Sequence, residues 1–412
     1  MSTGLFITAI TPELETFLLG RIVTGCGAAG VMTTTIILVL ELSSRKRRGL
    51  FLGLLSASYT TGIASGVLAG VVAPAFHWDI SQRAVYYVQA VFALIAGLLV
   101  CISIPSSRRP QTANSSPGQL DYLGVLTLTG SMILLLYSLA STDMPALPII
   151  LSIVLFIVFL IVETRYAAQP IIPRTVLGSR SVLTTCFANI GFMISRWAVL
   201  FYTPVYALAV RGWPPASAGL ILIPTNAGFG LGGLLVGWAH IRKADSYYTS
   251  CLIIYLLFAL TFLPLSSIST PDSDVVYYVI GVFLNGFFAG ALMNYTLSHL
   301  LYLTIPQTHF ILTSVVAMSR EFLDRPIDEP ELIHQLLGSP ALVTALTGIR
   351  KPIAVEAYED ATTTLFLAGC ALTVVATAIQ AGTGWNSPNN VTKNNIENLD
   401  GADVVDTEEH PI

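Results

Sequence analysis

Long apolar segments separated by short polar ones dominate this chain. Ten segments approach the length of about 20 residues that a helix needs to cross a bilayer, and residues 1–11 resemble the end of another helix. The pattern predicts an all-α polytopic helical membrane protein with about 10–11 membrane helices present. The expected spans are approximately 14–42, 50–76, 84–104, 123–141, 147–163, 184–210, 216–240, 247–267, 275–305 and 361–381.

Basic residues alternate between the loops that connect these segments. The loops after the first, third, fifth and seventh spans contain eleven Lys and Arg residues, whereas the alternate loops contain only Arg83 and Arg211. Short cytoplasmic loops carry an excess of Lys and Arg. The span 14–42 is therefore expected to run inward, and 275–305 is expected to end on the cytoplasmic side.

The composition changes after Ile305. Residues 306–360 contain too many charges for a lipid span, so we expect a polar or amphipathic connector there. With no full span between, 361–381 should run outward and place the acidic tail outside. Two alternatives avoid this: the apolar patch Ile311–Met318 re-enters the membrane, or the sequence is an incomplete version of a longer protein. We prefer incompleteness.

Composition agrees with a membrane protein and excludes several other classes. Hydrophobic residues make up 54% of the chain and charged residues 11%, with a mean hydropathy of +0.72; soluble domains contain about 25% charged residues. No basic tract indicates nucleic-acid binding. The five cysteines fall singly in different apolar segments, which indicates neither a metal site nor a redox pair. No cofactor and no enzyme activity are expected.

Arg21 lies roughly two turns inside the first long span. An arginine within a spanning helix costs about 2.5–3.5 kcal/mol on insertion scales and usually faces a polar cavity or partner. The small residues that follow it, among them Gly25 and Gly27, allow a neighbouring backbone to approach closely. Arg21 is therefore a functional candidate.

A stripe of three glycines follows in the segment 50–76. Gly62, Gly66 and Gly70 recur every four residues and so lie on one helix face. Such a stripe would let two helices rock against each other. The alternative is plain tight packing, because small-residue spacing is common in helical membrane proteins.

Polar residues in the later spans are candidates for a substrate path. Asn189 precedes Arg196 by seven positions, so both lie on about the same helix face. Arg196 is expected to line a cavity, with snorkelling towards an interface as the alternative. Pro224 and several glycines should break the helix around Asn226. The remaining candidates are Asn285 and Asn294, for which interhelical hydrogen bonding is the alternative.

Two of these motifs resemble the major facilitator superfamily, most of all its fourteen-helix drug:proton antiporter branch, which includes fungal multidrug and vacuolar amino-acid transporters. Arg21, Gly25 and Gly27 match the family pattern R-x-x-x-G-x-G-A-A, whose arginine is implicated in proton coupling. The stripe of Gly62, Gly66 and Gly70 matches the antiporter motif of the next helix, although Val67 stands where the family has proline. This resemblance implies that the chain is truncated at its N-terminus.

The resemblance implies a division of the chain into helix bundles and connectors. The expected parts are the remainder of the N-terminal helix bundle (1–105), a cytoplasmic loop (106–122), two additional linking helices (123–163), a second cytoplasmic loop (164–183), the C-terminal helix bundle (184–305), the connector (306–360), the last membrane helix (361–381) and a disordered acidic tail (382–412).

The expected function is transport of a small solute such as a drug or an amino acid, by proton-coupled export through alternating access. The alternatives are a transport-incompetent membrane sensor or partner subunit, or a fragment of a longer transporter. We expect a monomer in the plasma or vacuolar membrane, with a small-molecule substrate, protons and the lipid bilayer as its partners. Arg21 would couple protons, the three-glycine stripe would act as a hinge, and the later polar residues would line the path.

Overall fold

The computed structural model describes residues 1–10, 13–43, 47–72, 81–103, 121–140, 145–166, 178–240, 247–303 and 350–384. These parts of the chain contain helices and no strands. Within them, eight helices are long and apolar enough to span a membrane, and Tyr122–Ser138 forms a shorter apolar helix. The predicted all-α membrane fold is therefore confirmed.

The helices of the first half follow the predicted spans closely. A short helix precedes the first long span, as the apolar start of the chain predicts. The last two helices of this half form a hairpin in which Ser131 and Ser152 each donate a hydroxyl hydrogen bond to the other's backbone carbonyl oxygen, both at 2.9 Å. The elements are α1 (Ser2–Ile10), α2 (Leu14–Leu42), α3 (Arg48–Val72), α4 (Ser81–Ser103), α5 (Tyr122–Ala140) and α6 (Ala146–Arg165).

Prolines divide two segments of the second half that the hydropathy pattern shows as continuous. Proline has no N–H and crowds the carbonyl four residues earlier. Pro224 accordingly lies four residues after the break at Leu220, and Pro264 lies four residues after Leu260. The elements are α8 (Arg180–Ala209), α9 (Pro215–Gly219), α10 (Leu222–Ala239), α11 (Tyr248–Leu260), α12 (Phe262–Ile268), α13 (Val275–Leu303) and α17 (Arg350–Ala381).

The beginning of the last helix differs from the prediction. The helix α17 begins at Arg350 and not at 361, so residues 350–360 belong to a helix and not to the connector. Charge content indicates where lipid ends, but a helix can continue beyond the bilayer with its charged side chains in water. The rest of the predicted connector, 306–349, lies outside the described residues.

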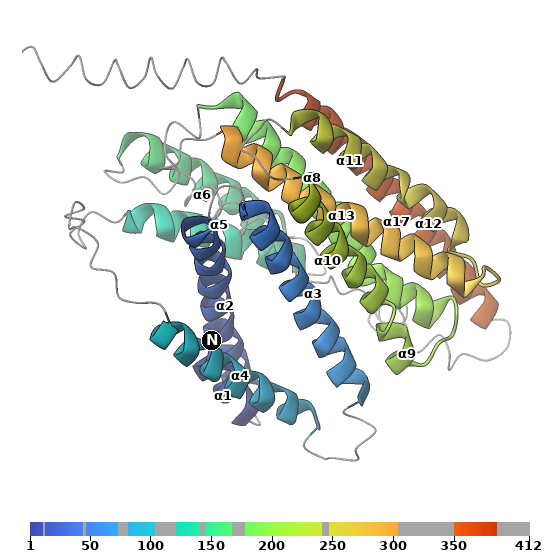
Figure 1. Cartoon of the computed structure of the whole chain (residues 1–412). Coiled ribbons are helices and arrows are strands. Elements are labelled where there is room, and N and C mark those ends of the chain that lie inside the picture. Colours follow the sequence, from blue (N-terminus) through green and yellow to red (C-terminus); the bar gives the residue numbers. More distant parts are fainter. Residues whose placement is uncertain are drawn as a thin grey trace, which may run out of the picture.

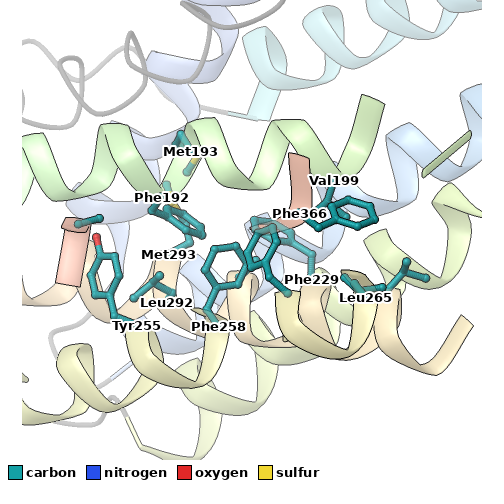
Figure 2. Packing of buried hydrophobic residues seen from close by; sticks show 14 of the residues in the cluster. Phe192, Met193, Val199, Phe229, Tyr255, Phe258, Leu265, Leu292, Met293 and Phe366 are labelled. Atoms are coloured by element: carbon teal, nitrogen blue, oxygen red, sulfur yellow. The ribbon is translucent and has the colours of Figure 1, made fainter. Parts of the chain in front are cut away.

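Aromatic side chains form the core of the C-terminal bundle, whose helices are labelled in Figure 1. Helices α8, α11, α13 and α17 surround it, and Figure 2 shows the rings interleaved between them. Phe258 lies 5.2 Å from both Phe192 and Phe262, ring centroid to ring centroid, with edge-to-face geometry in each pair. Edge-to-face pairs of this kind fix ring positions as well as burying area, so the bundle has a defined interior.

Helix α10 packs between α3 and α13, and glycines allow the close approach on both faces. A Cβ atom at Gly228 or Gly232 would overlap the backbone of α13 at Phe283 or Phe287. On the other face, a Cβ atom at Gly53 of α3 would lie 2.7 Å from the carbonyl oxygen of Gly233. Helix α3 therefore joins the C-terminal bundle through α10, whereas α1, α2 and α4 pack on one another.

The last helix runs in the direction of α13. The Tyr248 hydroxyl, at the start of α11, donates to the carbonyl oxygen of Ala381 at 2.9 Å, and its ring lies 6.3 Å from that of His299. Helices α13 and α17 therefore end on the same side of the bundle. The outward direction that follows from counting no crossing between α13 and 361–381 is therefore not observed. The alternative in which Ile311–Met318 re-enters the membrane concerns residues outside the described ones. The predicted acidic tail lies largely outside the described residues.

Candidate functional site

Arg196 of α8 is buried in the middle of the C-terminal bundle. Its side chain is 4% exposed, so it does not snorkel to an interface. One guanidinium nitrogen, Nη2, donates to the backbone oxygen of Thr225 at 3.5 Å and to Oδ1 of Asn226 at 3.4 Å. Both distances exceed the usual range of about 2.7–3.2 Å. The guanidinium is thus held by long, weak bonds to neutral acceptors on α10.

Asn226 is oriented by its own helix. Its amide nitrogen donates to the carbonyl oxygen of Leu222 at 2.9 Å, which turns Oδ1 towards Arg196. One turn further along α10, the ring of Phe229 lies 5.5 Å from the guanidinium carbon, within the range of a cation–π interaction. The predicted path residues Arg196 and Asn226 are therefore brought together, on a polar and an aromatic surface of α10.

Asn285 of α13 lies at the same depth in the bundle. Its neighbour Gly286 packs on the carbonyl oxygen of Thr225, the atom that accepts from Arg196. The Asn285 amide nitrogen donates to the hydroxyl of Thr261 at 2.8 Å, at the break between α11 and α12. Its amide oxygen is buried without a hydrogen-bond partner in the described chain. We call Arg196, Thr225, Asn226, Thr261 and Asn285 the central polar layer.

Two other predicted path residues lie elsewhere. Asn294 bonds helix to helix, because its amide nitrogen donates to the carbonyl oxygen of Gly233 at 3.0 Å. Asn189 is buried on α8 two turns before Arg196. Of the two, Asn294 thus shows the interhelical bonding that the sequence left open as an alternative.

Arg21 lies in a different part of the molecule from the central polar layer. Its side chain is exposed on α2, and the guanidinium carbon lies 6.0 Å from the ring of Tyr86 on α4. A Cβ atom at Gly25 would have nothing within 4 Å, whereas one at Gly27 would lie 2.6 Å from the Cα atom of Met1 on the approaching N-terminal segment. Of the two small residues, only Gly27 makes the predicted close backbone contact.

The three-glycine stripe faces open space where its surroundings are described. A Cβ atom at Gly62 or Gly66 would meet nothing within 4 Å; Gly70 lies within α3, but its surroundings are outside the described side chains. The tight packing of α3 is instead made earlier in the helix, where Gly53 meets α10. Sequence spacing identified a small-residue face, but it did not identify which part of that face has a neighbour.

Polar residues at the two ends of the bundle were missed by the sequence reasoning. At one end, Arg211 donates to the Tyr206 hydroxyl at 2.9 Å and to the Ser273 hydroxyl at 2.8 Å, which ties the loop after α8 to the loop before α13. At the other end, Nδ1 of His240 lies 2.6 Å from the hydroxyl of Tyr295. Tyrosine near a span end gives a weak sequence signal, since such residues are common at membrane interfaces.

The central polar layer offers donors and acceptors without a nucleophile. Arg196 supplies N–H donors and a fixed positive charge, the asparagine amides supply both donors and acceptors, and Phe229 supplies an apolar face. No group of three or more potential metal-ligating side chains occurs among the described residues. The arrangement is suited to reversible, non-covalent binding of a small polar solute.

Comparison with known proteins gives one family. The family described as the Major Facilitator Superfamily matches residues 1–317 of this chain. That match covers both α2, with Arg21, and the helices of the central polar layer.

Several fungal transporters are similar to parts of the chain. Citrate exporter 1 of Yarrowia lipolytica (strain CLIB 122 / E 150) is 26% identical over 206 residues, which cover 48% of this chain and 30% of the exporter. The MFS-type efflux pump elcC of Phaeosphaeria nodorum is 23% identical over 297 residues, covering 67% and 51%. The efflux pump aflT of Aspergillus parasiticus is 25% identical over 262 residues, covering 59% and 49%. The chain thus spans about half or less of the length of these relatives.

Proposed function

Because the chain belongs to the Major Facilitator Superfamily, we propose that it moves a small solute across a membrane by proton-coupled export through alternating access. The observation that carries this proposal is the burial of Arg196 in a polar layer built by α8, α10, α13 and the break between α11 and α12. Intramembrane charges are costly and mark substrate or ion paths. The naming of relatives as efflux pumps and as a citrate exporter supports export.

We propose that the solute presents an acceptor group, such as a carboxylate or carbonyl oxygen, to Arg196. The guanidinium already binds two neutral oxygens at long distance, and a solute oxygen that replaced one of them would gain a shorter, stronger bond. Phe229 would contact the apolar body of the same solute.

The proposed partners are the solute, protons and lipid. The proposed state is a monomer, and the proposed location is the plasma or vacuolar membrane.

The test is flux in proteoliposomes that contain the full chain. Radiolabelled citrate is a suitable first probe because it carries carboxylates, and a panel of amino acids and a cationic dye widens the search. We expect Arg196→Gln to reduce flux at least about tenfold, corresponding to loss of one charge-assisted hydrogen bond. Arg196→Lys, which keeps the charge but loses the planar fork, should retain part of the flux.

Arg211→Gln is the matched control, because Arg211 is also hydrogen-bonded within the bundle but lies outside the central polar layer. Equal losses in the two variants would indicate general destabilisation. If the unmodified chain moves no member of the panel yet folds normally, the transport-incompetent sensor or partner subunit becomes the better explanation.

Arg21 and the three-glycine stripe enter the proposal as coupling and hinge elements. We expect Arg21→Ala to abolish the dependence of flux on a proton gradient while leaving gradient-independent exchange. Its exposed position on α2 means that the substitution removes no core packing. Flux that remains gradient-dependent in Arg21→Ala would remove Arg21 from the coupling mechanism.

A further inference from the structure

A buried histidine near the end of α13 is left out of the proposed transport path. His299 is 1% exposed, and neither ring nitrogen has a hydrogen-bond partner in the described part of the chain. The one ring contact described for it is with Tyr248 of α11, at 6.3 Å between centroids. Buried polar groups without partners are rare in native structures and call for an explanation.

A second buried side chain at the same end shares this property. Gln380 of α17 is 0% exposed, and neither of its amide atoms has a hydrogen-bond partner among the described residues. Tyr248 connects the two places, because its ring contacts His299 while its hydroxyl donates to Ala381, the residue after Gln380. The start of α11 and the ends of α13 and α17, on the side that the basic loops predict to be cytoplasmic, therefore meet around buried side-chain atoms that have no described hydrogen-bond partner.

His240 provides a contrast within the same end of the bundle. It is exposed, and its Nδ1 bonds the hydroxyl of Tyr295 at 2.6 Å. Tyr295 precedes His299 by one helical turn on α13. His240 is thus hydrogen-bonded, whereas His299 is enclosed without a described partner. We call this arrangement, in which His299 is enclosed, the closed form.

We propose that His299 is a proton-binding site that controls opening of the cytoplasmic end of the C-terminal bundle. In the closed arrangement, an added proton would leave two N–H donors enclosed without acceptors, which is costly. When α11 and α17 move away from α13, water that enters between the helices can accept hydrogen bonds from the imidazolium. The proton therefore binds the open form more strongly than the closed form, and no other chemical step is involved.

This inference rests on the proposed transport function. It supplies a side chain that can bind and release the coupled proton, which that proposal does not otherwise contain. Arginine keeps its proton at all relevant pH values, so Arg21 can influence coupling but cannot carry the coupled proton. Histidine is the side chain whose ordinary pKa, about 6.5, lies within the physiological range.

Few charged groups surround His299 in the described structure. On its own helix, Tyr295 lies one turn away, and α17 has no titratable side chain between Cys370 and Gly384. The described titratable and charged residues at this end of the other neighbouring helices are Tyr247, just before α11, Tyr248 and Cys251 on α11, His240 after α10, Arg180 and Cys186 on α8, and Arg47 and Arg48 at the start of α3.

The direction of the pH effect follows from linkage. Because the open form binds the proton more strongly, lowering the pH shifts the equilibrium towards the open form. With an open-form pKa near the ordinary 6.5 and no protonation of the closed form, the open fraction rises about fourfold between pH 8 and pH 6.

Cys251 gives a direct readout of this opening. It is buried on α11 one turn after Tyr248, so a maleimide can reach it only when this end opens. In a variant with Cys26, Cys101, Cys186 and Cys370 replaced by serine, we would measure the rate of N-ethylmaleimide labelling from pH 8 to pH 6. At each pH, the labelling rate is divided by the rate of the same protein that also carries His299→Gln. This division cancels the pH dependence of the Cys251 thiol itself, since both proteins carry that thiol.

We expect the ratio to rise about fourfold as the pH falls over this range. His240→Gln is the matched control and should keep the rise. A constant ratio, or a rise that disappears in His240→Gln, would overturn the proposal. His299→Asn replaces His299→Gln if the latter does not fold.

The readout separates this inference from the proposed function, since labelling requires no flux. A pH-dependent ratio without flux of any probe would contradict transport and leave the proton site standing. Flux with a constant ratio would overturn the proton site alone.

Discussion

Three asparagines of the C-terminal bundle differ in what their side-chain amides contact. Asn294 is used within the fold, since it bonds the backbone of α10. Asn226 is oriented by its own helix and accepts from Arg196. Asn285 donates to Thr261 but leaves its amide oxygen without a described hydrogen bond. The first amide is structural, and the other two retain capacity for a ligand.

Replacing these residues should therefore separate stability from transport. Asn294→Leu removes an interhelical hydrogen bond and should lower the free energy of unfolding by about 0.6–1.7 kcal/mol, with flux per folded molecule retained. Asn285→Leu should reduce the flux per folded molecule, and its effect on the free energy of unfolding should not account for that loss. Unfolding in mixed micelles and flux in proteoliposomes measure the two effects, and the opposite order would contradict the assigned roles.

Residue type alone identified much of the candidate site. Arg196 and Asn226 were predictable because charged and amide side chains are rare within apolar spans and so stand out. Phe229 and Thr225 were not, since an aromatic ring or a backbone carbonyl in a spanning helix has no distinctive pattern. The separation of Arg21 from Arg196 was also invisible, because periodicity gives the face of a helix and not the helix opposite it.

Among the elements, α10 is the one most constrained by its neighbours. Glycines on one face admit the backbone of α13, and glycines on the other admit α3. Such contacts place backbones within van der Waals distance, where dispersion attraction and packing replace the hydrophobic effect that is absent between helices in lipid. A side chain at Gly232, or at Gly237 on the other face, would overlap the backbone of the neighbouring helix and push that helix away.

Gly232→Ala should therefore be destabilising although it adds only a methyl group. The new Cβ atom would overlap the carbonyl oxygen of Phe287, and overpacking typically costs about 1–3 kcal/mol. Gly66→Ala is the matched control, because a Cβ atom there has nothing within 4 Å. Thermal unfolding in detergent should show a lower midpoint only for Gly232→Ala; a similar loss in both variants would contradict the packing described for α10.

Element boundaries show where the sequence pattern was sufficient. The span 14–42 coincides with α2, because both of its ends are marked by polar residues. The proline at 224 predicted a broken helix in the segment 216–240, and a break is observed at Leu220–Ile221 and not around Asn226, which lies within the continuous α10. The division after Leu260 was not predicted, since a proline inside a strongly apolar run leaves the hydropathy unchanged. The early start of α17 was hidden by charges that lie beyond the lipid.

At the scale of the whole molecule, the direction of α17 fixes which ends of the helices share a side. Its last turn lies beside the first turns of α8 and α11, and the basic loops predict that this side is cytoplasmic. Hydropathy alone could not give this direction, because it counts crossings and does not show which helices pack antiparallel.

Cysteine accessibility in intact cells tests this topology. A cysteine placed by Gly384→Cys, just after α17, should react with a membrane-impermeant maleimide only after the cells are permeabilised. A cysteine placed by Asp272→Cys, in the exposed loop before α13, should react without permeabilisation. Labelling of the 384 cysteine in intact cells would place the end of α17 outside and reverse the assigned orientation.

The position of α10 between an earlier and a later helix also constrains biogenesis. During synthesis, α3 is available before α10 emerges, whereas α13 follows it. In a nascent chain that stops before α13, the α10 surface at Gly228 and Gly232 is exposed, together with the backbone carbonyls that α13 would cover. We expect such an intermediate to be recognised by membrane-embedded quality control until α13 is inserted.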